Sequence, residues 1–372
     1  MSTWACRLSD VAAGPRGPRR ARRGRWHRCV KVHASHLRPL APSTNGKGTP
    51  VKLPTLQDIE AASQVVYRAM PPTPQYRWAT SSQRLGTDCW FKHENHSPVG
   101  AFKIRGGLTF FDALRARGEL PRAVISATRG NHGQSVAWGA RLHGVRCTIV
   151  VPHGNSVEKN AAMRALGAEL IEHGDDFQAS REHAAALALA QGALMVPSFG
   201  AELVRGVATG WWEFFRAAPE LDVAYVPIGL GSGVCAAIAA KRALGHPARI
   251  VGVVSRHATT YADSLAAGKV VAAPVSTVLA DGMACRVAES DALDILRAHV
   301  DHLVQVDDTE VAQAMRAIFA DTHNVAEGAG AAGFAAALQE RVLNRGRVVG
   351  TVLCGGNVDS AMFARVLGGG IA

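Results

Sequence analysis

The sequence lacks cysteines at the spacing that structural metal sites and redox motifs use. Its seven cysteines are scattered over 372 residues, and no two of them form a CxxC pair. An odd and dispersed set argues against a disulfide framework and against structural zinc. We therefore expect free thiols, no bound metal and a reducing cytoplasm.

Long apolar runs are also missing. No segment approaches the roughly 18 uninterrupted apolar residues of a membrane-spanning helix, and no apolar stretch follows the N-terminal bases as in a secretory signal. The composition, 48% hydrophobic and 19% charged, is that of a globular protein with enough material for one large or two modest domains. We expect no membrane partner.

Acidic residues are almost absent from the first 50 positions. Asp10 stands there against eleven lysines and arginines, so this segment carries +10 of the formal net charge of +11. Its mixture of Gly, Pro and Arg predicts a disordered extension over residues 1–52. Three interpretations stay open: a polyanion-binding tail, an organellar transit peptide, or upstream sequence without function. The nearly neutral remainder argues against a nucleic-acid partner.

From residue 53 onward, short apolar strands alternate with amphipathic helices, which predicts an α/β fold with parallel sheets covered by helices. Strands are expected at 123–127, 147–152, 168–172, 193–197, 223–228, 248–254 and 347–353. Helices are expected at 132–143, 157–167, 177–191, 234–244, 308–321, 329–344 and from Ser360.

Three turns follow predicted strands, where parallel sheets place ligands: Thr128–His132, Gly229–Gly233 and Cys354–Asn357. The glycine turn leads directly into a helix, so backbone N–H groups there can hold a phosphate. It has neither the GK[ST] ending of a P-loop nor a clean GxGxxG pattern. Tight packing alone also explains such a turn.

Lys103 lies between Phe102 and Ile104 in the segment PVGAFKIRGG. Apolar surroundings remove hydration from an ammonium group, lower its pKa and produce a nucleophilic amine suited to Schiff-base chemistry. The alternative is a surface lysine whose stem covers the core while its amine reaches water.

Six segments occur in a fixed order: KHENHSPVGAFKIRGG, SATRGNHGQS, VPIGLGSG, LADGM, AEGAGAAG and LCGGNVD. Together they resemble the fold-type II pyridoxal phosphate enzymes, which are of the tryptophan-synthase-β type, over about residues 54–367. The serine/threonine dehydratase and serine racemase branch is the most similar. The resemblance implies pyridoxal 5′-phosphate and β-elimination of water from threonine or serine, giving a 2-oxo acid and ammonia. Hydroxyaspartate dehydration, serine racemisation and β-replacement remain alternatives.

The resemblance also implies roles for single residues. Lys103 would form the Schiff base and move the Cα proton. The cofactor would contact Phe102, Asn131, Gly229, Leu230, Gly231, Ser232, Gly233, Gly282, Glu327 and Cys354. The substrate carboxylate would be received by the turn of Thr128, Arg129, Asn131 and His132, and by Arg181.

Several positions depart from the family pattern. Cys354 replaces a serine or threonine that hydrogen-bonds the pyridine nitrogen, and a neutral thiol is a weaker donor. Arg129 replaces the serine that serves as second acid/base in the racemases, which disfavours racemisation. It would either face solvent, tie down domain closure, or bind a second carboxylate, as in 3-hydroxyaspartate. Val254 and Thr260 replace metal-binding carboxylates, so we expect no divalent site.

We expect two domains, with the cofactor between them. The large one comprises residues 53–122 and 200–372, and the small mobile one comprises residues 123–199. The chain ends soon after Leu367, so a C-terminal regulatory domain is not expected. A homo-oligomer, a dimer in the simplest case, is expected by resemblance.

Overall fold

The structure is a computed structural model that describes residues 51–371. The basic segment 1–50 lies outside the described residues, so its predicted disorder is not tested. Within the described part the chain forms two sheets, and all strand pairings are parallel except that of β1 with β2. This confirms the predicted α/β class.

The larger sheet has the strand order β1-β2-β10-β7-β8-β9. Its central strands β10 and β7 are almost wholly buried, as expected for strands covered on both faces. The bounds are β1 Gln75–Arg77, β2 Cys89–His93, β10 Val349–Leu353, β7 Val223–Pro227, β8 Arg249–Ser255 and β9 His302–Val306.

The smaller sheet has the order β5-β4-β3-β6. Its strands are β5 Glu169–Glu172, β4 Arg146–Val151, β3 Ala123–Ala127 and β6 Leu194–Met195. All four lie within residues 123–199, while the strands of the larger sheet lie outside that range. The division into a large and a mobile small domain stays a prediction.

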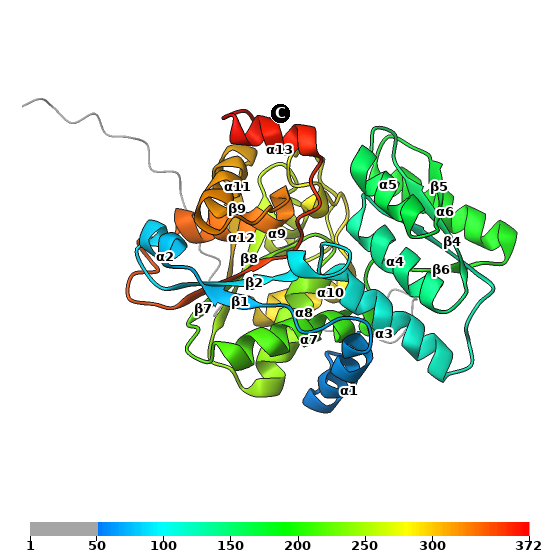
Figure 1. The fold of residues 1–372 in the computed structure, drawn as a ribbon, viewed down its shortest axis with the longest axis horizontal. Coiled ribbons are helices and arrows are strands. Elements are labelled where there is room, and N and C mark those ends of the chain that lie inside the picture. The colour runs from blue at the N-terminus through cyan, green and yellow to red at the C-terminus, as the bar shows by residue number, and fades with distance from the viewer. Residues whose placement is uncertain (1–50, 372) are drawn as a thin grey trace, which may run out of the picture. The chain divides into compact units, whose positions relative to one another are not determined.

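Helices cover both sheets, and Figure 1 shows α4, α5 and α6 gathered around the smaller one. None of the helices in the described residues is long and apolar enough to cross a membrane. The bounds are α1 Leu56–Tyr67, α2 Ala79–Leu85, α3 Lys103–Ala116, α4 Asn131–Leu142, α5 Val157–Ala165, α6 Phe177–Gln191, α7 Ala201–Ala217, α8 Ser232–Leu244, α9 Thr260–Ala267, α10 Ser290–His299, α11 Asp308–Thr322, α12 Gly328–Gln339 and α13 Ser360–Leu367.

Local sequence explains where several helices begin and end. Thr55 and Asp58 form a capping box at the start of α1, and Asp307 and Glu310 form another at the start of α11. Asp176 accepts a hydrogen bond from the backbone N–H of Ala179 at the start of α6, which ends at a left-handed glycine. These residues satisfy backbone groups that helix ends leave unpaired.

Helix α12, with the sequence GAGAAGFAAALQ, is buried from Gly328 to Ala337. Its small residues let the helix lie close to β7 and β10, since a Cβ at Gly333 would collide with the hydroxyl of Thr351. Phe334 fills the remaining space against Phe91, with ring centroids 5.1 Å apart. This packing fixes Glu327, the residue just before the helix, relative to the sheet.

Candidate active site

The carboxyl ends of β3, β7 and β10 lead to a pocket with about 810 Å³ of empty space, part of it open to solvent. Parallel strands place loops and helix N-termini together at this edge, which is why residues far apart in sequence meet there. All predicted site residues except Arg181 line the pocket: Phe102, Lys103, Thr128, Arg129, Asn131, His132, Gly229, Leu230, Gly231, Ser232, Gly233, Gly282, Glu327 and Cys354.

Lys103 is the first residue of α3, and its Nζ donates a hydrogen bond to Ser232 Oγ at 2.9 Å. The ammonium lies 5.1 Å from the centroid of the Phe102 ring. Burial without a carboxylate partner lowers the pKa of Lys103 to about 8. A substantial fraction of this amine is therefore neutral near physiological pH, as a nucleophile requires.

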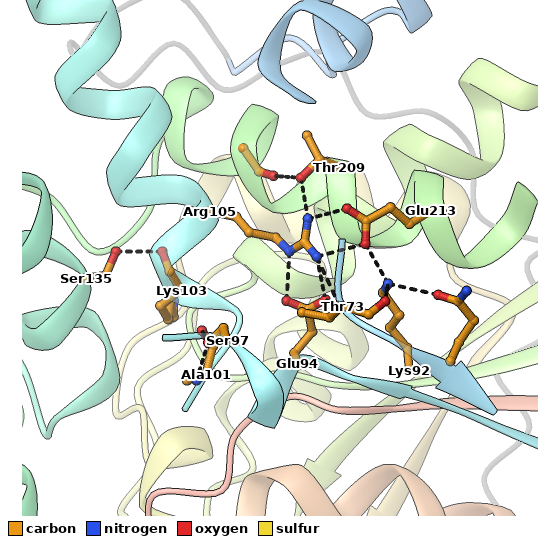
Figure 2. A network of polar contacts seen from close by, with 12 residues as sticks. Thr73, Lys92, Glu94, Ser97, Ala101, Lys103, Arg105, Ser135, Thr209 and Glu213 are labelled. Carbon is orange, nitrogen blue, oxygen red and sulfur yellow. Dashed lines mark hydrogen bonds and ion pairs between the residues drawn. The ribbon is translucent and has the colours of Figure 1, made fainter. Parts of the chain in front are cut away.

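The backbone around Lys103 is anchored on both sides. Ser135 Oγ donates to the Lys103 carbonyl at 2.6 Å, and the Phe102 N–H donates to the Cys354 carbonyl at 3.0 Å. Ser97 accepts from the Ala101 N–H and donates to the Ala101 carbonyl (Figure 2). These contacts hold the amine at a defined position in the pocket.

A buried ionic network supports the first turn of α3 from behind (Figure 2). The Arg105 guanidinium donates to Glu94 at 2.8 Å and to Glu213 at 2.7 Å, and Lys92 donates to Glu213 at 2.5 Å. Thr73 and Thr209 also bond to the guanidinium. Such a network stays stable only because nearly every lone pair and proton has a partner.

The glycine turn between β7 and α8 requires glycine. Gly231 has φ +101°, and a Cβ there would lie 2.6 Å from the Cβ of Ala292. A Cβ at Gly229 would collide with the carbonyl oxygen of Gly282. No side chain caps the N-terminus of α8, so the backbone N–H groups of its first turn face the pocket without an internal acceptor. This cradle fits a phosphate group.

Asn131 and Glu327 meet across the pocket. Asn131 Nδ2 donates to Glu327 Oε1 at 2.6 Å, and Asn357 donates to Asn131 Oδ1 at 2.9 Å. Burial raises the pKa of Glu327, although the nearby Lys159 opposes that shift. Asn131 is thus held by protein groups that fix its orientation.

Sequence analysis did not assign Lys159, although it lies on α5 with its side chain only 6% exposed. Its Nζ lies 2.7 Å from Asp281 Oδ2 and 3.1 Å from Glu327 Oε2. Burial alone would lower the pKa of Lys159, but Asp281 and Glu327 outweigh it and raise the pKa. The position of Lys159 in the pocket is hard to predict from the sequence. A single lysine in the helical segment VEKNAAMRALG follows the same pattern as a helical lysine that faces solvent.

The turn after β3 is organised by Thr128, whose hydroxyl accepts from the N–H groups of Gly130 at 2.8 Å and Gly133 at 3.3 Å. Burial and the nearby Lys103 lower the pKa of His132 to about 3, so its imidazole is neutral. Arg129 lies half-buried on the pocket wall. Helix α4 begins directly after this turn, with its N-cap at Gly130.

Arg181 is the predicted residue that the structure places outside the pocket lining. Its guanidinium pairs with Glu289 at 3.0 Å, and its side chain is 42% exposed. In this arrangement the residue joins α6 to the start of α10. The contact of Arg181 with the substrate carboxylate stays a prediction, and it requires the Arg181–Glu289 ion pair to break.

Two cysteines line the pocket, the predicted Cys354 and the unpredicted Cys285. Burial raises the pKa of both thiols, so both are neutral; for Cys285 the pKa is about 12. Among the described residues no cluster of three or more His, Cys, Asp or Glu side chains is arranged to hold a metal ion. Other lining residues that the sequence motifs did not assign are Phe177, Ser198, Pro227, Asp281, Met283, Ala284 and Ala329.

Pyridoxal phosphate matches this donor set. A lysine with a lowered pKa stands beside a glycine cradle at a helix N-terminus, and Phe102 offers an aromatic face next to that amine. The amine suits the aldehyde, the cradle suits the phosphate, and Cys354 lies on the same wall.

Comparison with known proteins agrees with this geometry. The family described as pyridoxal-phosphate dependent enzyme matches residues 66–355. The chain is 38% identical to an L-threonine ammonia-lyase of Geobacter sulfurreducens over 78% of this chain and 72% of that protein. It is 29% identical to an L-threo-3-hydroxyaspartate ammonia-lyase of Saccharomyces cerevisiae over 85% and 97%, respectively.

Solved structures give the same result. A pyridoxal 5′-phosphate-dependent aspartate racemase superimposes with a TM-score of 0.78 at 26% identity, covering 83% of this chain and 97% of that one. The chain therefore belongs to the family of pyridoxal-phosphate dependent enzymes, with the fold-type II architecture.

Proposed function

We propose that this protein is an ammonia-lyase that removes water and then ammonia from threonine and serine. The observation that carries the proposal is Lys103, a half-buried lysine that lines the pocket beside the uncapped N-terminus of α8 and whose pKa is lowered to about 8. The similarity to the L-threonine ammonia-lyase of Geobacter sulfurreducens supports threonine as the first substrate to test.

When bound, pyridoxal phosphate supplies the electron-withdrawing system that acidifies the Cα proton. The protein's own groups do the rest. Lys103 would hold the cofactor and, once its amine is free, take the proton from Cα as general base. The turn Gly229–Gly233 would hold the phosphate through backbone N–H groups, and Phe102 would cover the ring.

The substrate carboxylate would be received by the backbone N–H groups that open α4, next to the turn organised by Thr128. Asn131, fixed by Glu327 and Asn357, would orient the ring. The β-hydroxyl would leave as water with a proton moved by Lys103. The walls formed by Phe177 and the segment 281–285 would limit access of solvent to the reacting atoms.

Elimination is favoured over two rival reactions. Racemisation needs an acid/base on the second face of Cα, and the arginine at position 129 stays charged at any working pH. β-Replacement needs a second nucleophilic substrate, and a 2-oxo acid assay without added nucleophile separates it from elimination.

The proposed function also includes a cellular location, an oligomeric state and a mobile domain. We propose a role in amino-acid breakdown in a reducing cytoplasm, which the free and buried state of the five described cysteines supports. We also propose a homodimer, to be tested by sedimentation. The segment 123–199 would be a small domain that closes over the substrate; ion pairs such as Lys159–Asp281 and Arg286–Asp176 tie it to the rest of the chain.

The test measures 2-oxo acid and ammonia released from threonine and serine by wild type, Lys103→Ala and the control Lys269→Ala. Lys269 is exposed and does not line the pocket, so its loss should leave activity unchanged. We expect turnover by wild type and the control and none by Lys103→Ala. Wild-type protein that holds the cofactor but forms no 2-oxo acid from either amino acid would refute the proposal.

A further inference from the structure

Arg129 carries a charge that no acidic side chain among the described residues neutralises. It lies half-buried on the pocket wall, and its Nε is buried without a hydrogen-bond partner. Among residues 51–371 its guanidinium forms no ion pair, although the neighbouring Lys159 and Arg181 both do. A partly buried guanidinium without a partner is unfavourable unless a ligand supplies the missing acceptors.

The carboxylates of the pocket are already engaged. Asp281 and Glu327 both contact Lys159, and Glu289 pairs with Arg181. None of these three acids can neutralise Arg129 without giving up a buried or half-buried partner. The pocket therefore keeps one cation available for a ligand anion.

One substrate carboxylate does not require this cation. Helix α4 begins two residues after Arg129, and Thr128 accepts from the N–H groups of Gly130 and Gly133, which leaves those of Asn131 and His132 for a ligand. Two adjacent backbone N–H groups at a helix N-terminus suit one α-carboxylate. The planar guanidinium, which matches a carboxylate with two parallel hydrogen bonds, is then free for a second acidic group.

We propose that Arg129 binds a second carboxylate carried on Cβ, so that the enzyme prefers a β-hydroxy amino acid with an acidic side chain, such as 3-hydroxyaspartate, over threonine and serine. This inference rests on the proposed function and narrows its substrate. The reaction breaks the Cα–H and Cβ–OH bonds and releases water. Hydrolysis of the resulting enamine consumes one water and gives a 2-oxo dicarboxylic acid and ammonium, so no oxidant or reductant is needed.

The rival role for Arg129 is to bind the cofactor phosphate. The geometry disfavours it, because the glycine turn and the N-terminus of α8 already form a phosphate cradle on the larger sheet, whereas Arg129 extends from the smaller one. A phosphate role predicts weaker cofactor binding and an equal loss for every substrate. A carboxylate role predicts a loss confined to acidic substrates.

The first experiment measures kcat/KM for L-threo-3-hydroxyaspartate, threonine and serine with wild type, Arg129→Gln and Arg129→Lys. The control is Arg164→Gln, an exposed arginine on α5. We expect wild type and the control to prefer hydroxyaspartate. Arg129→Gln should lose about ten- to a hundredfold on hydroxyaspartate, the value of a charge-assisted contact, and little on threonine or serine. Arg129→Lys should recover part of the loss.

A second experiment does not depend on turnover. It compares the binding of succinate, which has two carboxylates, with that of butyrate, which has one, to the holoenzyme by calorimetry. Wild type should bind succinate more tightly, and Arg129→Gln should remove that difference while retaining the cofactor with unchanged affinity.

Each outcome of these experiments supports or overturns the role of Arg129 as the site of a second carboxylate. Turnover of threonine or serine without turnover of hydroxyaspartate, or a substrate ranking unchanged in Arg129→Gln, overturns the inference and leaves the proposed function standing. Equal losses on all substrates with weaker cofactor binding assign Arg129 to the cofactor and also overturn it. If no substrate yields a 2-oxo acid, the proposed function fails, and the succinate comparison alone decides whether Arg129 binds a second carboxylate.

Discussion

Lys103 is half-buried, and its amine donates to the neutral Ser232 hydroxyl rather than to a carboxylate. Lys92 and Lys159 are more deeply buried, and each is paired with an acid. Asp281 and Glu327 raise the pKa of Lys159, whereas burial lowers the pKa of Lys92 despite its bond to Glu213. The difference matters chemically, because an ion-paired ammonium has no lone pair to offer. Of these three lysines, only Lys103 lines the pocket without an acidic partner.

This predicts a pH dependence for cofactor loading. The pKa of Lys103 is lowered to about 8, so the amine is charged below that pH and neutral above it. The rate at which apoenzyme forms its covalent link with pyridoxal phosphate should therefore rise between pH 7 and pH 9 and then level off. Stopped-flow absorbance measures this rate. A rate that keeps rising beyond pH 10 would indicate an unperturbed lysine.

The assignment of Lys103 as the Schiff-base lysine also predicts which residue carries the cofactor after borohydride reduction. Borohydride reduction of the holoenzyme followed by peptide mapping should locate the cofactor on Lys103, and Lys103→Ala should bind cofactor without a reducible link. Recovery of a labelled peptide containing Lys92 or Lys159 would show that the assignment is wrong.

At the scale of single elements, the sequence was most informative where the apolar period was regular. The helix predicted at 177–191 is α6 with the same bounds, and the strand predicted at 223–228 is β7 within one residue. The helix predicted at 329–344 ends at Gln339, because the residues after it form turns rather than a further helical turn. The strand predicted at 193–197 shrinks to two residues.

Other features could not be predicted from one sequence. Helix α7 carries Thr209 and Glu213, two members of the network behind Lys103, but their role depends on contacts with Arg105 about a hundred positions earlier. Lys159 was missed for the same reason, since its partners lie on the segment before α10 and on the start of α12. The pocket residues that were predicted came from motifs, and motifs do not reveal which polar groups are already paired.

Replacing Lys159 on α5 should strongly lower the stability of the fold. Lys159→Met should cost about 3–5 kcal/mol in the free energy of unfolding, because it leaves the acids Asp281 and Glu327 in a buried site without their cation. Arg164→Met, on the same helix, should cost less than about 1 kcal/mol, since its pair with Glu172 is exposed. Urea denaturation of both variants tests the contrast, and equal losses would contradict it.

The ion pair between Arg105 on α3 and the buried Glu94 predicts that acid lowers the stability of the fold. Burial alone would raise the pKa of Glu94, but Arg105 and Lys92 outweigh burial and lower it. A carboxyl with a lowered pKa stabilises the fold above its ordinary pKa, and the contribution is lost as pH falls toward the folded value. Glu94→Gln should therefore be less stable than wild type at pH 7, and the gap should narrow toward pH 3. Thermal unfolding across this range measures it; a gap that widens on acidification would contradict the sign.

At the scale of the whole molecule, charge and chemistry occupy different parts of the chain. The site is built entirely from residues between 102 and 354, while residues 1–50 hold +10 of the net charge of +11. The described part beginning at Val51 is tied down by its own contacts, such as the Val51 N–H to Asp291 at 3.1 Å.

Deleting residues 2–50 should therefore remove most of the net charge and leave the activity unchanged. We expect kcat/KM to stay unchanged and stability to change by no more than about 0.5 kcal/mol, as for changes remote from a packed site. Retention on a polyanionic column such as heparin should fall, because it depends on the number of released counterions. A full-length control with Arg16, Arg19, Arg20, Arg22 and Arg23 changed to Gln keeps the chain length and removes half of the segment's charge. Activity below a tenth of wild type in the deletion, but not in this control, would show that the segment serves the enzyme through its length rather than its charge.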